Sequence, residues 1–422
     1  YTPNKENNVF QLVVQYGAGE REFPKLGYAA QLMNNAGIMG AYEPQELKEE
    51  LSKLNATCHV TADDDNLYII MEGYEATLPQ ACQLLSRQIL MPKLDEKQLA
   101  RLKGSAMGMR QQRKDNVSIL NEALRQYMLY GEKSDYIKEL TDKEIYELQI
   151  SELTGDINRA SNYEAKVFFT GTLPFDQVYD ILSKNLPLVA NERPSNSPQA
   201  KDMMPVTENT VYFLPNNDAE QAQIHLYIPM QKADKKDDVL RSAFNQYFGL
   251  DFTGIVLNEI REKRSMAYTA YAFVGTQGIA GKASYLRGYI GTQNDKANDA
   301  LDVLMGLVND MPKNPERIDN IKSYLRQAML TSHPSFRNKA MELVDLGYRG
   351  YTDDPAKENL PKVDALTFDD IVKFYEENIK DKPYCISIMG NPKNIDLKRL
   401  EKFGKVVKLN ERKLFNTKDA LF

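Results

Sequence analysis

The order of the predicted helices and strands occurs twice along this chain of 422 residues. A segment between the two copies, Pro187 to Pro205, contains four prolines and many small polar residues, which is typical of a linker. A chain of this length also exceeds what one hydrophobic core usually serves, about 250–300 residues. We therefore interpret the chain as a duplication, with a first domain over residues 1–190, a linker over 191–208 and a second domain over 209–422.

Each copy is predicted to open with a strand and to close with a strand that ends near a glycine. The first copy has predicted strands at 9–15, 57–62, 66–72 and 164–170, with helices at 26–35, from 44, and at 78–90, 95–130 and 175–186. The second copy has predicted strands at 223–229, 267–274, 282–291 and 383–389, with helices at 238–248 and 252–260 and from 295, 315 and 367. Strands in hairpins and helices in clusters favour an α+β fold with two homologous domains. Each domain is expected to be a largely antiparallel mixed sheet with helices packed on one face.

The charge balance excludes some classes of partner. The chain has 53 basic and 59 acidic side chains and a net charge of −6, which argues against nucleic acid or an anionic membrane surface as the main partner. No run of about 18 apolar residues occurs, so no membrane span is predicted. The chain starts at Tyr1 without the basic and apolar regions of a signal peptide, and we expect that it was cut or processed from something longer.

The cysteines and histidines form no metal or redox motif. No CxxC pair is present, and we expect buried apolar thiols at Cys58, Cys82 and Cys385. Two histidine ligands one helical turn apart would share a helix face, but no histidine here has such a neighbour. We therefore expect packing or surface residues at His59, His225 and His333, and no metal or other cofactor bound by this chain.

One segment, Phe248 to Tyr268 (FGLDFTGIVLNEIREKRSMAY), resembles a signature of the insulinase/pitrilysin family of zinc metallopeptidases, which includes mitochondrial processing peptidase. In that family a glycine-rich turn leads into a helix that ends in R-E-x-x-G-L-A-Y and is followed by a strand. Arg261 and Tyr268 stand at the matching places, whereas Ser265 and Met266 replace the usual Gly-Leu. Together with the duplication, the resemblance covers essentially the whole chain.

The zinc motif of that family is absent at the matching place. The family carries an inverted motif, H-x-x-E-H, on a helix, and a glutamate ligand further along the chain. In the segment 27–37, Ala30, Met33 and Asn34 stand where the first histidine, the glutamate base and the second histidine would be. Alanine has no lone pair to offer, methionine cannot accept a proton from water, and an amide is a poor zinc ligand. Between Glu96 and Glu122 the only carboxylate is Asp115, so the downstream ligand is missing too.

The resemblance implies that this chain is the C-terminal half of such a peptidase, without zinc. Family members are clam shells of four similar domains, on one chain or on two, with zinc in the first domain. The half without zinc supplies an arginine and a tyrosine that reach across the chamber. We therefore expect a chain that is no enzyme by itself, with a zinc-bearing half or subunit as its partner, a peptide as the substrate, and Arg261 and Tyr268 as substrate-positioning groups.

The chemistry of the two side chains agrees with this role. Hydrolysis of a peptide by zinc-bound hydroxide develops negative charge on the scissile oxygen, and each preorganised donor there is worth about 3–4 kcal/mol. A phenol can donate to that oxygen, and a guanidinium can hold substrate carbonyls. Strand alternation predicts that Tyr268 shares a face with the small residues Ala270 and Ala272, which would leave room for a ligand. Without the resemblance, the arginine would be a solvated helix residue and the tyrosine a core or interface residue.

Two other hypotheses stay open. The chain could be a non-enzymatic scaffold, like the structural core subunits of respiratory complexes that share this fold, or an independent zinc peptidase with other ligands. The sequence itself indicates no compartment. A periplasmic location is an expectation drawn only from exported bacterial members with a similar two-half plan.

Overall fold

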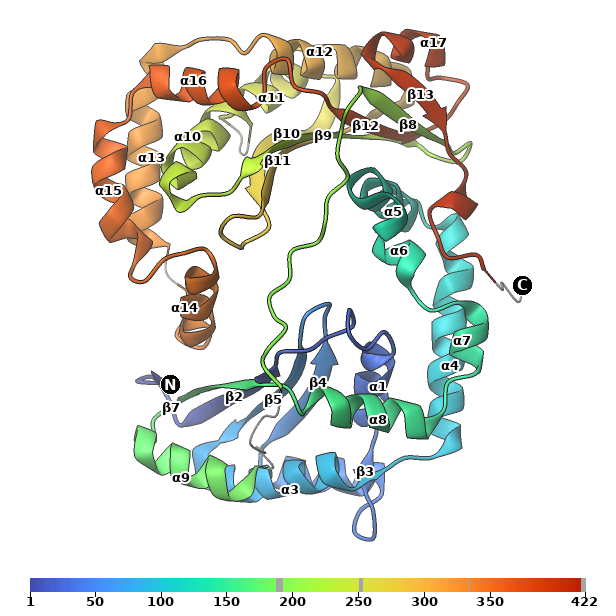
Figure 1. The fold of residues 1–422 in the computed structure, drawn as a ribbon, viewed down its shortest axis with the longest axis vertical. Helices are drawn as coiled ribbons and strands as arrows, with labels where there is room; N and C mark the ends of the chain where they lie inside the picture. Colours follow the sequence, from blue (N-terminus) through green and yellow to red (C-terminus); the bar gives the residue numbers. More distant parts are fainter. Residues whose placement is uncertain (187–192, 250–252, 333, 419–422) are drawn as a thin grey trace.

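The computed structural model describes residues 1–186, 193–249, 253–332 and 334–418 as two lobes, each built on its own sheet (Figure 1). The segment that joins the lobes runs along the molecule without helix or strand from residue 194 to 206. The predicted linker, 191–208, begins with two residues that lie outside the described ones. None of the described helices is long and apolar enough to cross a membrane.

The first sheet has five strands in the order β1-β7-β2-β5-β4. In that order the strands are Thr2–Pro3, Ala165–Gly171, Val9–Tyr16, Leu67–Tyr74 and Thr57–Ala62. All neighbours are antiparallel except β1 and β7, which are parallel. The strand β4 is therefore an edge strand. Two further short strands, β3 (Gly37–Ile38) and β6 (Pro92–Lys93), pair apart from this sheet.

The second sheet has six strands in the order β10-β11-β9-β12-β8-β13. They span Ala267–Thr276, Ala283–Gln293, Gln221–Lys232, Cys385–Gly390, Thr210–Pro215 and Lys405–Lys408. The strand β8 is parallel to β12 and to β13, and the other neighbours are antiparallel. Read from β10 to β8, the order repeats that of the first sheet read from β4 to β1. The predicted fold, α+β with two related mixed sheets, is confirmed.

Helices of each lobe cover one face of its sheet. The first half of the chain contains α1 (Leu26–Met33), α2 (Pro44–Lys53), α3 (Leu78–Leu90), α4 (Glu96–Gln111), α5 (Val117–Tyr130), α6 (Asp135–Lys138), α7 (Asp142–Tyr146), α8 (Ile150–Ala160) and α9 (Phe175–Asn185). The second half contains α10 (Asp238–Phe248), α11 (Ile255–Leu257), α12 (Ala297–Asn309), α13 (Ile318–Thr331), α14 (Lys339–Tyr348), α15 (Pro355–Ala365), α16 (Phe368–Asn378) and α17 (Leu397–Leu400). The predicted helix at 252–260 starts at a residue outside the described ones.

The long helical region predicted over 95–130 consists of two helices, because the chain breaks between α4 and α5. A 3-10 turn, Gln112–Asp115, follows α4. The side chain of Asn116 then accepts hydrogen bonds from the amides of Ser118 and Ile119 at 3.0 and 3.2 Å and caps α5. Asparagine favours such a cap over a helix interior, since its side chain competes with the helical hydrogen bonds.

After the break, α5 packs against the other lobe. Although α5 lies in the first half of the sequence, its apolar side packs on the face of the second sheet that the helices of that lobe leave open (Figure 1). Leu120, Ala123 and Leu124 of α5 form one buried cluster with Leu214 of β8 and Met389 of β12. The boundary at residue 190 remains a prediction, but the packing of α5 crosses it.

Candidate functional site

Arg261 lies on a helix of unusual geometry that leads into the edge strand β10. The helix begins as α11 and continues as a π-helical segment over Asn258–Glu262. The amide of Lys263 donates to the carbonyl oxygen of Asn258 at 3.0 Å, which is the five-residue spacing of a π-helix. Single π-helical turns occur frequently at functional sites. Ile260 on this turn is fully buried, whereas the Arg261 side chain is 34% exposed.

The helix ends at Ser265 in the left-handed conformation. The amide of Ser265 donates to the carbonyl oxygen of Arg261 at 2.8 Å, and the amide of Met266 donates to that of Ile260 at 3.0 Å. The bond from Ser265 to Arg261 is the 5→1 bond of the αL capping motif, whose left-handed residue is usually glycine. Ser265 has φ of +48° and stands at the position of the glycine in the resembled motif.

A β-bulge decides where Tyr268 points. The pairing of β10 with β11 shifts between Ala267 and Thr269, so Tyr268 is the extra residue of the bulge. Ala270 and Ala272 face the core, but Tyr268 is 78% exposed. The prediction that Tyr268 shares a face with the two alanines is therefore wrong, because one inserted residue breaks the two-residue alternation.

The bulge brings Tyr268 and Arg261 together. The central guanidinium carbon of Arg261 lies 5.0 Å from the centre of the Tyr268 ring, within the range of a cation–π contact. The Nε atom of Arg261 also lies 3.4 Å from a carboxylate oxygen of Glu262. The contact holds the guanidinium beside the exposed ring and leaves the phenol hydroxyl open to solvent.

The pair lies on an open surface of the chain. Two cavities among the described residues, of about 760 and 840 Å³, are lined by other side chains. A phenol hydroxyl donates one hydrogen bond and a guanidinium offers five N–H donors. The pair can therefore serve a ligand that reaches this lobe from outside and presents carbonyl or carboxylate oxygens.

The three positions of the degenerate zinc motif lie on or just after α1. Ala30 and Met33 are each 2% exposed and pack in the core of the first lobe. Asn34 follows the helix and binds the main chain of β4 with its side-chain amide. Among the residues that the structure describes, no group of three or more histidine, cysteine, aspartate or glutamate side chains is placed to hold a metal. An apolar side chain, a thioether and an amide already engaged with the backbone do not fit a zinc ion.

The described thiols and imidazoles belong to no group of three or more side chains that could hold a metal. Burial raises the pKa of the thiols of Cys58 and Cys82 to about 12 and that of Cys385 to about 11, which suppresses the reactive thiolate. His59 is exposed and His225 is buried, as expected for surface and packing residues. The third predicted position, His333, lies outside the described residues.

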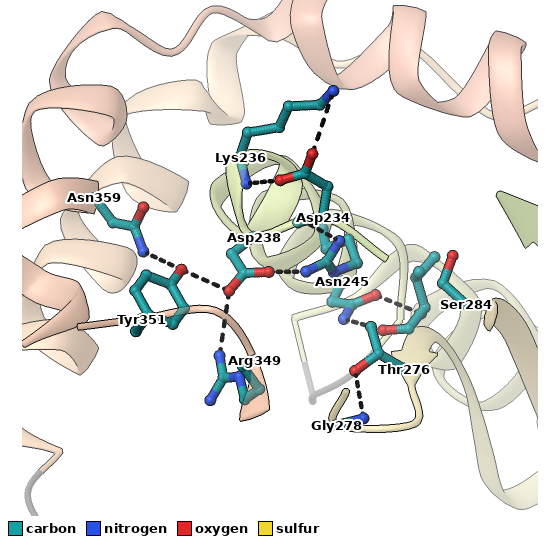
Figure 2. Close-up of polar contacts among 12 residues, drawn as sticks. Asp234, Lys236, Asp238, Asn245, Thr276, Gly278, Ser284, Arg349, Tyr351 and Asn359 are labelled. Atoms are coloured by element: carbon teal, nitrogen blue, oxygen red, sulfur yellow. Dashed lines mark hydrogen bonds and ion pairs between the residues drawn. The ribbon is translucent and has the colours of Figure 1, made fainter. Parts of the chain in front are cut away.

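The sequence analysis missed a polar network that fixes α10, the helix before the arginine–tyrosine segment (Figure 2). Asp238, at the start of α10, accepts a hydrogen bond from the Tyr351 hydroxyl at 2.7 Å and pairs with Arg349 at 3.2 Å. It also pairs with Arg241, and Asn359 donates to the Tyr351 hydroxyl at 2.9 Å. No sequence signal joins residues more than a hundred positions apart, so only the fold could reveal this network.

The comparisons with known proteins agree with the fold. Residues 161–325 match the family model described as the peptidase M16 inactive domain, a segment that contains both Arg261 and Tyr268. No curated protein matches the chain. Among solved structures, the crystal structure of a peptidase M16 inactive domain from Pseudomonas fluorescens is similar with a TM-score of 0.70 and 16% identity, over 92% of this chain and 94% of that chain.

Two longer proteins are also similar. The periplasmic protease PqqL from Escherichia coli aligns with a TM-score of 0.69 and 13% identity, over 92% of this chain but only 43% of its own. The ferredoxin protease FusC, in complex with Arabidopsis ferredoxin, aligns with a TM-score of 0.70 and 12% identity, over 91% of this chain and 42% of its own. This chain thus spans about two fifths of the length of these two proteases. The resemblance to the insulinase/pitrilysin peptidases is confirmed: residues 161–325 match the inactive domain of the M16 peptidases, and the chain has the fold of that domain.

Proposed function

We propose that this chain is the non-catalytic half of a zinc metallopeptidase, that it closes a substrate chamber against a metal-bearing half, and that it holds the scissile peptide with Arg261 and Tyr268. The observation that carries the proposal is the preassembled, exposed Arg261–Tyr268 pair in a chain whose zinc positions are filled by Ala30, Met33 and Asn34.

The lengths of the similar proteases support a two-half arrangement. PqqL and FusC are each more than twice as long as the part that this chain matches, so each has room for a second half of similar size. In this arrangement the exposed side of the pair would face the other half. The metal-bearing half could lie upstream on the same polypeptide or on a separate subunit, and a periplasmic location remains an expectation.

Each side chain has a distinct role in the proposed chamber. Tyr268 donates its hydroxyl hydrogen to the scissile carbonyl oxygen as negative charge develops there, since its ring is exposed and its hydroxyl is open to solvent. Arg261 binds a neighbouring substrate carbonyl with the N–H donors of its guanidinium. At the zinc positions, Ala30, Met33 and Asn34 supply no base and no ligand that would activate the attacking water.

Reconstitution with the metal-bearing half tests the proposal. The wild-type chain should restore peptide cleavage, whereas Arg261→Ala and Tyr268→Phe should each lower kcat about 100-fold, the usual loss when one donor to a developing oxyanion is removed. The zinc content of the complex should stay the same. Wild-type turnover with both variants would contradict the proposal.

A matched control lies one helical turn away. Arg264 pairs with the carboxylate of Glu259 at 2.6 Å, whereas the guanidinium that lies against the Tyr268 ring is that of Arg261. Arg264→Ala removes an equal charge from the same helix, and turnover should stay near that of the wild type. If the chain is a scaffold instead, all three variants should leave every peptidase activity unchanged while the chain forms a tight complex with partners that are not peptidases.

A further inference from the structure

The side chain of Asn34 binds the edge strand of the first sheet at two points. Its Nδ2 atom donates to the carbonyl oxygen of Val60 at 2.8 Å, and its Oδ1 atom accepts from the amide of Val60 at 2.7 Å. Val60 lies in the middle of β4, which has β5 on one side and, among the residues that the structure describes, no strand on the other. The amide of Asn34 therefore occupies the side of β4 on which a further strand would pair.

The second lobe repeats this contact at the equivalent place. Asn245 lies on α10, and its Nδ2 atom donates to the carbonyl oxygen of Val274 at 3.0 Å while its Oδ1 atom accepts from the amide of Val274 at 2.6 Å (Figure 2). Val274 lies on β10, the edge strand that corresponds to β4. Just after α10, the carbonyl oxygen of Gly249 also accepts from the amide of Ala272 at 3.0 Å.

A side-chain amide can take the place of a backbone peptide at a sheet edge. An edge strand presents unpaired N–H and C=O groups that recruit another chain, and proteins protect such edges in several ways. The amide of asparagine carries one carbonyl and an NH₂ group, so it satisfies both groups of one residue at once. Here each asparagine does so for a valine of an edge strand, Asn34 from the end of α1 and Asn245 from α10.

We propose that Asn34 and Asn245 are edge clamps that close the β4 edge of the first sheet and the β10 edge of the second sheet to an added strand, in particular to the edge of a second copy. The two clamps lie in different lobes. In each, the asparagine donates one hydrogen bond to its valine and accepts one from it. At the first clamp, the position that the family resemblance assigns to a zinc histidine holds the sheet edge instead. This role is independent of Arg261 and Tyr268, so it stands whether or not the chain acts in proteolysis.

Amide hydrogen exchange tests the clamps directly. In the full chain, Asn34→Ala should speed exchange at the amide of Val60, and Asn245→Ala should do so at Val274, by about tenfold each, the equivalent of one lost hydrogen bond. Asn35→Ala is the matched control, because the amide of Asn35 is exposed and donates only to Gln31 on its own helix, at 3.2 Å. Exchange at Val60 should not change in that control.

Sedimentation tests the closure of the edges. The double variant with Asn34→Ala and Asn245→Ala should associate with itself at concentrations at which the wild type and Asn35→Ala do not. Asn34→Asp keeps the oxygen that accepts from the Val60 amide but loses the NH₂ group that donates to the Val60 carbonyl oxygen. The Val60 amide should therefore stay protected from hydrogen exchange in this variant, while the hydrogen bond to the Val60 carbonyl oxygen is lost. This variant covers the case in which the alanine variants fail to fold. Unchanged exchange at Val60 and Val274, or a folded double variant that sediments like the wild type, would overturn the proposal.

Discussion

The protonation of His225 depends on the residues that surround it in the fold. Its Nε2 atom lies 2.9 Å from the Oδ1 atom of Asn121 on α5, and its ring packs against Tyr289. Burial, and then the positive charges of Arg287 and Arg125, lower the pKa of His225 to about 3. The fold therefore holds this histidine neutral between α5 and the second sheet.

The depressed pKa predicts a loss of stability in acid. The unfolded chain protonates His225 near pH 6.5, whereas the fold binds that proton only near pH 3. The stabilising contribution is thus complete above pH 6.5 and falls by about 1.4 kcal/mol per pH unit between pH 6.5 and about 3. From pH 7 to pH 5, urea denaturation should show that the wild type loses about 2 kcal/mol more than His225→Gln. His59→Gln, at an exposed histidine, should follow the wild type, and parallel curves for all three proteins would contradict this prediction.

Replacement of Ser265 is expected to increase the stability of the fold. A left-handed conformation costs a residue with a side chain about 1–2 kcal/mol, and glycine avoids this cost. Ser265→Gly should raise the free energy of unfolding by about 1 kcal/mol, measured by thermal or urea denaturation. The hydrogen bonds of Ser265 and Met266 to Arg261 and Ile260 come from the backbone, so the Arg261–Tyr268 contact should survive the change. Equal or lower stability of the variant would show that the Ser265 side chain compensates for its conformation.

At the scale of elements, two helices cross between the lobes with unequal strength. The helix α5 buries Leu120, Ala123, Leu124, Met128 and Leu129. The helix α14 comes from the second half of the chain and approaches the first sheet, where the hydroxyl of Tyr348 accepts from Lys166 on β7 at 3.0 Å. None of the α14 side chains is fully buried. The two lobes thus exchange helices, but only α5 is anchored by apolar packing.

Matched substitutions in the two helices should separate these roles. Leu124→Ala removes a fully buried side chain between α5 and the second sheet and should cost about 2–5 kcal/mol of unfolding free energy. Leu343→Ala on α14 removes a side chain that is 59% exposed and should change stability by less than about 0.5 kcal/mol. Denaturation of both variants under the same conditions provides the comparison. Similar losses would mean that α14 is anchored as firmly as α5.

At the scale of the whole molecule, the lobes should unfold together. The helix α5, from the first half of the chain, is buried against the second sheet, so each lobe covers apolar surface of the other. The segment between the lobes also forms hydrogen bonds with both of them. The amide of Gln199 donates to Asp65 of the first lobe at 3.3 Å, and the carbonyl oxygen of Lys201 accepts from Gln277 of the second at 2.7 Å.

Calorimetry tests this coupling. We expect one cooperative transition for the full chain, because exposure of the buried α5 interface would destabilise either lobe alone. Leu124→Ala weakens the contact between the lobes. It should therefore either divide the unfolding into two transitions or lower the temperature of the single transition. Two separate transitions in the wild type, each unaffected by Leu124→Ala, would show that the lobes are independent.

Much of the fold could be predicted from the sequence, but the orientation of the candidate site could not. The limits of α3 and of β4 were predicted correctly, because hydrophobic periodicity and turn residues act over a few positions. Arg261 and Tyr268 could be chosen as a pair because they lie seven positions apart within one motif. The direction of Tyr268 depends on a bulge, and a bulge depends on how β10 pairs with β11. The amide pairing of Asn34 and Asn245 has no sequence signal at all.

The sequence by itself determined the α+β fold and the loss of the family's zinc motif at its usual place, because these depend on residue identity and on neighbours within a few turns. Alanine at position 30 and methionine at 33 cannot supply the histidine and the glutamate that the motif has at those positions. The tertiary structure alone decided that α5 covers the other lobe, that a bulge places Tyr268 beside Arg261, and that two asparagines bind the edge strands β4 and β10. These contacts join distant segments, and their geometry is set by how the complete sheets and helices pack.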